Sequence, residues 1–162
     1  MTEFALDTAV DITLGFEGGY VNDPNDAGGE TKYGISKKAY PDVDIKNLTI
    51  EQAREIYKRD YWDRCKCAFM PDALSIALFD FAVNSGTKRA VMYLQRALNV
   101  TVDGIIGNQT IGACNRLPTK DVFEKFIRYR KEYLMGLRTW KYFGNGWGRR
   151  VEFVKKIGEQ YL

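Results

Sequence analysis

One acidic residue stands at the point where a predicted helix gives way to a glycine-rich loop. Glu17 follows Phe16 and precedes Gly18-Gly19-Tyr20, so its carboxyl has a helix behind it and an open loop in front. Aromatic neighbours partly desolvate such a carboxyl and raise its pKa, as a general acid requires. A solvated glutamate without a role is the structural alternative, but a negative charge at a helix C-terminus opposes the helix dipole. We therefore take Glu17 as the first candidate catalytic residue.

Further acids and a hydroxyl follow within the same loop. Asp26 lies nine residues after Glu17, with Asp23 before it and Thr31 after it. Glycosidic hydrolysis needs one protonated carboxyl for the leaving oxygen and a second group that activates water or stabilises the positive sugar ring. Asp26 and then Thr31 are the candidates for that second group, ahead of Asp23, and Asx-turn bonding is the alternative interpretation of both aspartates. Inverting and retaining chemistry both remain open, because they differ by a carboxyl separation.

The composition narrows the chemistry further. The 162 residues include no histidine, which excludes Ser-His-Asp and Cys-His catalysis and zinc sites with imidazole ligands. We interpret the three cysteines, Cys65, Cys67 and Cys114, as reduced structural thiols, since they make neither a disulfide framework nor a full ligand set. We expect no cofactor and no metal.

Charge and hydropathy bear on the partners. A net charge of +3 is far from a nucleic-acid-binding footprint, and there is no apolar run of the length that spans a membrane. We expect no nucleic-acid partner, no stable membrane insertion and a monomer. The first residues lack the basic-then-apolar order of a signal peptide, so we expect synthesis in the cytoplasm without a leader or anchor.

Helical patterns account for most of the chain. The first helix is predicted over 3–17, followed by a glycine-rich loop with a short hairpin around Gly28–Ile35. Thr49-x-x-Gln52 matches a capping box that begins a helix running through Asp60. Further helices are predicted over 72–84, 87–98, 108–115, 119–137 and 147–161. The segment 72–84 is apolar nearly all round and predicts a central buried helix that Gly86 ends. The expected fold class is mainly α.

The residues from Glu17 to Ile35 form a long and specific motif, EGGYVNDPNDAGGETKYGI. It resembles the signature of the glycoside hydrolase family 108 N-acetylmuramidases, which are phage endolysins and related bacterial lysozymes. The order Glu17, Asp26, Thr31 also resembles the catalytic arrangement of phage-type lysozymes, with an Asp-to-Thr interval one residue shorter. Two later motifs, Phe79–Gly86 and Leu94–Thr110, resemble the carboxy-terminal peptidoglycan-binding half that accompanies this catalytic half.

The resemblance implies a lysozyme-like helical fold and cleavage of the β-1,4 bond between N-acetylmuramic acid and N-acetylglucosamine. Glu17 would be the general acid, and Thr31 or Asp26 would position or activate the attacking water. Residues 1–64 would form the catalytic half, and residues 65–162 a helical peptidoglycan-binding half packed into the same globule. The partner would be the glycan strand of bacterial peptidoglycan, reached at the cell wall (the periplasm) after release from the cytoplasm.

A glycan cleft also needs flat apolar rings and amide groups. Tyr20 and Tyr33 lie in the loop motif, and Asn84 follows the most apolar helix, where it either caps that helix or lines the cleft. Trp147 lies in a glycine-rich segment that we expect to leave its aromatic rings accessible, whereas Trp62 and Trp140 are expected in the core. The basic residues of the final third either steer the protein to an anionic wall or form solvated helix faces. They are Arg128, Arg130, Lys131, Arg138, Lys141, Arg149, Arg150, Lys155 and Lys156.

Three alternatives to a hydrolytic muramidase stay open. A catalytically weak wall-binding or secretion-assisting protein could keep the fold, but pure binding does not require an acid at a helix end. A helical interaction module leaves the long glycine-acid loop without a purpose. A lytic transglycosylase uses one glutamate and no water, and its 1,6-anhydro product distinguishes it from a hydrolase.

Overall fold

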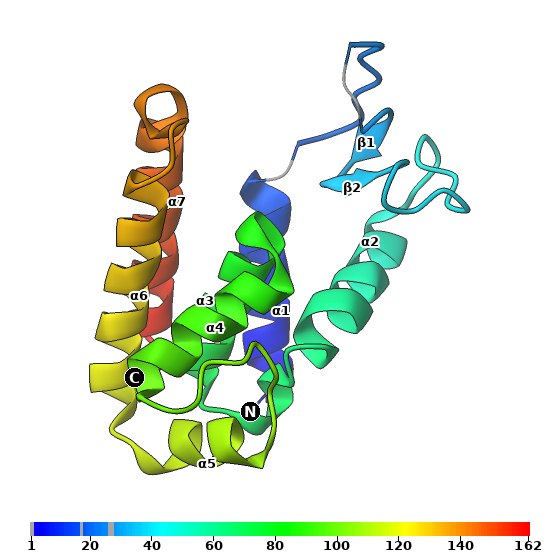
Figure 1. Cartoon of the computed structure of the whole chain (residues 1–162). Helices are drawn as coiled ribbons and strands as arrows, with labels where there is room; N and C mark the ends of the chain where they lie inside the picture. Colours follow the sequence, from blue (N-terminus) through cyan, green and yellow to red (C-terminus); the bar gives the residue numbers. More distant parts are fainter. Residues whose placement is uncertain (1, 17, 26–27) are drawn as a thin grey trace.

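The computed structural model describes residues 2–16, 18–25 and 28–162, and these residues form a helical protein with one small antiparallel sheet at its edge (Figure 1). The predicted mainly α, lysozyme-like class is confirmed. The elements in chain order are α1 (Thr2–Phe16), β1 (Thr31–Lys32), β2 (Ile35–Ser36), α2 (Ile50–Tyr57), the π-helix η1 (Lys58–Asp63), the 3-10 helix η2 (Cys67–Phe69), α3 (Asp72–Ser85), α4 (Thr87–Leu98), α5 (Asn108–Arg116), α6 (Thr119–Met135) and α7 (Trp140–Glu159).

Helix α3 lies at the centre of the core. Every residue from Ala73 to Ala82 is buried, because the helix is apolar nearly all round and is covered by α1, α4, α6 and α7. Gly86, with φ of 96°, ends the helix at the predicted residue. A single hydrophobic cluster extends from Ala5 in α1 to Val154 in α7, so the elements on both sides of α3 share one core.

The predicted hairpin after α1 is present. Strands β1 and β2 pair antiparallel, with Thr31 opposite Ser36, and Tyr33 and Gly34 form the turn between them. Both turn residues have positive φ, 53° and 78°, as a type I′ turn requires. In Figure 1 the hairpin and α2 lie on one side of the molecule and α6 and α7 on the other, with α1 and α3 between them.

Helix α2 begins as predicted but changes its winding early. Thr49 and Gln52 form both reciprocal bonds of the capping box. The helix was expected to run through Asp60, but it becomes π-helical at Lys58. Tyr61 and Trp62 lie in this wider turn, with their rings 6.4 and 6.0 Å from that of Phe79, and the ring of Tyr57, at the end of α2, lies 6.2 Å from it. Packing on α3 thus accounts for the departure from regular α geometry.

The last helix begins earlier than the sequence pattern indicates. It was expected to start at Trp147, but α7 starts at Trp140 and includes the glycines before Trp147. A Cβ at Gly144 would lie 2.6 Å from the Trp140 ring. This glycine therefore allows the indole to pack against the helix backbone and does not interrupt the helix.

Candidate active site

The loop that follows α1 folds back onto the hairpin. Val21 and Thr31 exchange two backbone hydrogen bonds of 2.8 Å each, so Thr31 pairs with Val21 on one side and with Ser36 on the other. Thr31 therefore occupies the middle of three chain segments, with its backbone fixed on both sides. A hydroxyl held in this way is suited to positioning a water molecule.

Tyr33 ties the hairpin turn to its surroundings through its backbone. Its N–H donates to the carbonyl of Gly18 at 3.0 Å, and its carbonyl accepts from the hydroxyl of Tyr57 at 2.5 Å. These bonds hold a non-glycine residue at positive φ, which is uncommon for an aromatic residue. The turn consequently has a fixed position relative to the start of the loop and to α2.

Tyr20 precedes Val21, the residue that pairs with Thr31, and its side chain contacts the residue before β1. Its hydroxyl donates to Oε2 of Glu30 at 2.8 Å, and this hydrogen bond to a carboxylate raises the pKa of Tyr20. The phenol stays protonated, and Tyr20 as a whole is 39% exposed, so part of its side chain is accessible to a ligand. The predicted substrate-binding residues Tyr20 and Tyr33 thus lie next to the small sheet that contains Thr31.

The two acids of highest interest are not among the described residues. Glu17 and Asp26 both lie outside the ranges that the structure describes, so their predicted roles rest on the sequence motif. Asp23 is described. It is exposed and accepts a hydrogen bond of 2.9 Å from the backbone N–H of Asn25, which is the Asx-turn interpretation given above.

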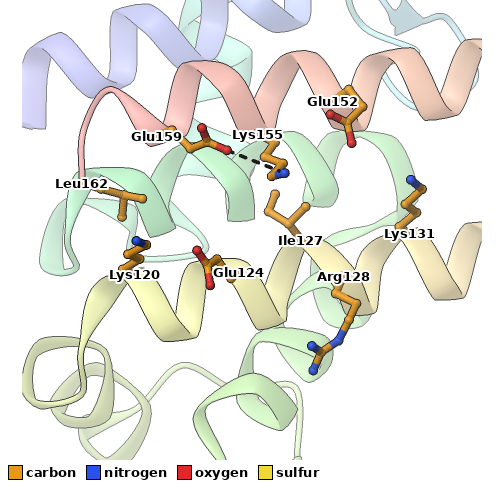
Figure 2. A pocket seen from close by; sticks show the side chains of 9 residues that line it. All are labelled: Lys120, Glu124, Ile127, Arg128, Lys131, Glu152, Lys155, Glu159 and Leu162. Atoms are coloured by element: carbon orange, nitrogen blue, oxygen red, sulfur yellow. Dashed lines mark ion pairs between the residues drawn. The ribbon is translucent and has the colours of Figure 1, made fainter.

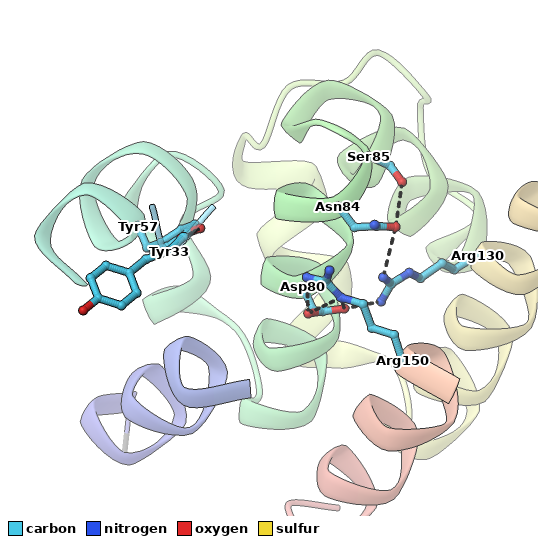
Figure 3. Close-up of polar contacts among 7 residues, drawn as sticks. All are labelled: Tyr33, Tyr57, Asp80, Asn84, Ser85, Arg130 and Arg150. Atoms are coloured by element: carbon cyan, nitrogen blue, oxygen red, sulfur yellow. Dashed lines mark hydrogen bonds and ion pairs between the residues drawn. The ribbon is translucent and has the colours of Figure 1, made fainter. Parts of the chain in front are cut away.

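A buried ionic cluster lies next to the end of α1 (Figure 3). Asp80 of α3 accepts from Arg130 of α6 at 2.7 Å and from Arg150 of α7 at 3.0 Å, and all three side chains are nearly inaccessible to solvent. Burial raises the pKa of Asp80, but the charges and hydrogen bonds of the two guanidinium groups outweigh it, and the net shift is downward. Asp80 is therefore ionised, and the cluster carries a net charge of about +1.

The cluster is connected to both predicted site segments. The guanidinium of Arg150 lies over the ring of Phe16, the last residue of α1, at 5.3 Å. Arg130 donates to Oδ1 of Asn84 at 3.4 Å, and Ser85 donates to the same oxygen at 3.2 Å. Asn84 is thus oriented by side-chain bonds near the end of α3. The positive charge next to the C-terminus of α1 also compensates the negative end of its dipole.

Trp147 lies in a different setting from Tyr20 and Tyr33. Its described ring contacts are with Trp140 at 6.3 Å and Phe143 at 5.6 Å, both on α7. Phe143 and Tyr142 are largely exposed, as expected for this segment, but Trp147 itself is partly buried. Trp62 is buried as predicted, and Trp140 packs partly buried against the core.

Sequence patterns did not identify Arg130 and Arg150 as buried residues. Both were counted among the basic residues that face solvent or the wall, but they are 2% and 7% exposed. Asp80 carried a usable signal, because an aspartate inside a helix that is apolar nearly all round requires an ionic partner. The pattern does not say which of the basic residues of the final third supply it.

A hollow between α6 and α7 has a volume of about 630 Å³ (Figure 2). Four basic and three acidic side chains alternate along it, and Lys155 pairs with Glu159 at 3.8 Å. Its charges largely compensate one another, so it has no clear preference for a charged ligand. Among the described residues, no group of His, Cys, Asp and Glu is arranged to hold a metal ion.

The three cysteines are free and buried, in agreement with structural thiols. Burial raises the pKa of Cys65 and of Cys114 to about 12 and that of Cys67 well above its ordinary value. A thiol that stays protonated is a poor nucleophile. In the part of the chain that the structure describes, no helix is both long enough and apolar enough to cross a membrane.

The fold and the hairpin site define a lysozyme-like α protein, and comparison with known proteins identifies its family. The glycosyl hydrolase 108 family model matches residues 10–86. The solved structure of SagA from Brucella abortus is 32% identical, with a TM-score of 0.87 over 98% of this chain and 96% of that one. No curated protein matched in a separate comparison. The chain belongs to the glycosyl hydrolase 108 family. It is thus a glycoside hydrolase, and the family implies peptidoglycan as the substrate.

Proposed function

We propose that the protein is an N-acetylmuramidase of the endolysin or lysozyme type. It hydrolyses the β-1,4 bond between N-acetylmuramic acid and N-acetylglucosamine in the glycan strand of the cell wall. The observation that carries the proposal is the family match over residues 10–86, which includes the whole segment from Glu17 to Ile35. The chain needs no histidine for this reaction, because glycosidases use carboxyl groups.

In this mechanism Glu17 is the general acid. It donates its proton to the glycosidic oxygen as the bond to the muramic acid carbon breaks. The net positive charge of the Asp80, Arg130 and Arg150 cluster lies beside Phe16, the residue before it. This charge compensates the negative end of the α1 dipole, at the point where the loop motif begins.

The second group is Asp26 or Thr31. Asp26 would act as a base or would stabilise positive charge on the ring, whereas Thr31 would hold the attacking water. The hydrogen bonds between Thr31 and Val21 support the second role, because they fix the strand that carries the hydroxyl. Tyr20, Tyr33, Asn84 and Trp147 are proposed to contact the sugars. Residues 1–64 carry the catalytic groups, and residues 65–162 contribute further contacts to the wall.

The first experiment compares the wild-type protein with Glu17→Gln on purified peptidoglycan, with soluble products identified by mass spectrometry. Gln keeps the shape of the side chain and removes the proton, so the rate should fall about 10³-fold or more. Glu55→Gln is the matched control, because Glu55 is an exposed acid on α2, and this variant should keep nearly full activity.

The products decide between the candidate reactions. Reducing muramic acid ends from the wild type, lost in Glu17→Gln, support the muramidase. 1,6-Anhydro muramic acid ends from the wild type would indicate transglycosylation, and not hydrolysis, at the same site. Binding without any product would instead favour a wall-binding protein, and an active Glu17→Gln variant would remove Glu17 from the mechanism.

The second group is tested with Asp26→Asn and Thr31→Ala in the same assay. The variant that loses its activity by about 10²–10⁴-fold identifies the group that acts on water or on the ring. The anomeric configuration of the first product, measured by NMR, distinguishes inversion from retention. Full activity in both variants would contradict a mechanism in which Asp26 or Thr31 is the second group.

A further inference from the structure

A groove between α4 and α6 lies outside the hairpin site. It consists of two adjoining hollows of about 770 and 460 Å³, which share Tyr93, Arg96, Val102 and Tyr133. Hollows of this size accommodate several residues of an extended ligand. The function proposed above assigns no specific role to this groove.

An alternating stack of guanidinium groups and phenol rings forms the wall of the groove. Arg96 lies 5.0 Å from the Tyr93 ring, that ring lies 5.4 Å from Tyr133, and Arg89 lies 4.9 Å from Tyr133. Both rings also contact the buried ring of Phe81, at 5.7 and 6.0 Å. The stack is therefore anchored on the core, and less side-chain freedom remains to be lost when a ligand binds.

The groove has an excess of positive charge. Lys88, Arg89 and Arg96 line it, with Glu132 as the opposing acid. Within the described ranges none of these three bases has an ion-pair partner at 4.0 Å or less. Stacked guanidinium groups keep their N–H edges available, and these edges match a carboxylate with two parallel hydrogen bonds. The groove is thus complementary to an anionic ligand.

The groove begins beside the candidate active site. Ser85 lines its first hollow and donates its hydroxyl to Asn84, the residue oriented by Arg130. A ligand that contacts Asn84 can therefore continue over Gly86 onto the start of α4. In peptidoglycan, each muramic acid carries a short peptide with free carboxylates next to the scissile bond. A glycan strand at Asn84 would place such a peptide next to Lys88 and Arg89.

We propose that the α4–α6 groove binds the carboxylate-bearing peptide stems of peptidoglycan. Arg89 and Arg96 would bind the carboxylates through their guanidinium edges, and the rings of Tyr93 and Tyr133 would pack against the aliphatic parts of the peptide. This inference rests on the proposed function, because it takes peptidoglycan as the ligand. It makes the peptide a determinant of substrate specificity in addition to the glycan.

The test measures binding to two soluble glycan chains, one with its peptides and one from which an amidase has removed them. Glu17→Gln serves as the background, so that binding is measured without turnover. In that background, Arg89→Gln with Arg96→Gln should weaken binding to the peptide-bearing chain about tenfold. Binding to the stripped chain should stay unchanged. Arg89→Lys with Arg96→Lys should restore only part of the loss, because a lysine keeps the charge but not the fork geometry.

The matched control removes the same charge elsewhere. Arg64 and Arg116 are exposed and do not line the groove, so Arg64→Gln with Arg116→Gln should bind both chains as the parent does. Equal weakening on both chains, or none, would overturn the proposal, as would an equal effect of the control variant. A wild-type protein that binds peptide-bearing chains selectively but releases no product contradicts the muramidase and supports the groove.

Discussion

At the scale of single residues, Asp80 is the position where one substitution should have the largest effect on stability. Its carboxylate compensates two buried guanidinium groups, Arg130 and Arg150. Asp80→Asn leaves both positive charges in the core without a counterion, and this should lower the free energy of unfolding by about 3–5 kcal/mol. Chemical denaturation of both proteins at pH 7 measures the difference.

A surface aspartate provides the control for this prediction. Asp63 pairs with Lys58 at 3.0 Å, and both side chains are about half exposed. Asp63→Asn should cost less than about 1 kcal/mol, because water screens an exposed pair. Similar costs for Asp63→Asn and Asp80→Asn would contradict the role assigned to the buried cluster.

The pH dependence of stability follows from the same residue. The pKa of Asp80 is lowered in the folded state, so the unfolded state binds more protons at mildly acidic pH. The contribution of Asp80 is then fully present above its unfolded pKa of about 4 and is lost as the pH falls through the folded pKa. The stability difference between wild type and Asp80→Asn should therefore shrink below about pH 4. A difference that stays constant down to pH 2 would contradict this linkage.

At the scale of elements, Gln95 holds the loop between α4 and α5. Its amide nitrogen donates to Asp103, Ile105 and Thr110 at 2.9–3.1 Å, and its oxygen accepts from the N–H groups of Asp103 and Gly104 at 3.0 and 2.9 Å. Gly104 has φ of 77°, a left-handed conformation that favours glycine. The buried side chain of Gln95 thus supplies hydrogen-bond partners to backbone groups that have none in a regular helix or strand.

Gln95→Leu should lower the free energy of unfolding by about 2–4 kcal/mol, because it leaves several loop groups without partners. Hydrogen exchange at Asp103 and Gly104 should accelerate more than exchange in α3. The control is Gln109→Leu, at an exposed position on α5, with an expected change within about 0.5 kcal/mol. Slow exchange at Asp103 in Gln95→Leu would show that other contacts hold the loop.

The sequence predicted the elements that local signals define. Gly86 marks the end of α3, and Thr49 with Gln52 marks the start of α2, since both signals act within one helical turn. It failed at the start of α7, where Gly144 serves a tertiary contact with Trp140. The same distinction between local and distant signals applies to the candidate site. The loop motif identified Tyr20, Thr31 and Tyr33, whereas the partners of Asp80 come from helices 50 and 70 residues further along the chain, which no local pattern indicates.

At the scale of the whole molecule, charge is distributed unevenly along the chain. Residues 1–64 contain 8 Lys and Arg against 13 Asp and Glu, and residues 65–162 contain 16 against 8. The part that holds the α4–α6 groove is therefore basic, and the part with the Glu17–Ile35 motif is acidic. An anionic wall polymer is attracted to the basic part and repelled by the acidic part, which favours one orientation at encounter.

The same two parts share one core, and this bears on whether residues 1–64 can fold alone. The apolar stripe of α1 includes Ala5, Ala9, Val10 and Ile12, all buried in the cluster that α3 completes. Without α3 these side chains would face water, and the segment 1–64 would bury too little apolar surface to offset its chain entropy.

We therefore predict that residues 1–64 alone are unfolded, with a coil-like circular dichroism spectrum and no cooperative thermal transition. The full chain, measured in parallel, should unfold in one transition that is the same by circular dichroism and by tryptophan fluorescence. A cooperative transition in the 1–64 fragment would instead make the two halves independent domains, and the groove would then act as a separate binding module tethered to the enzyme.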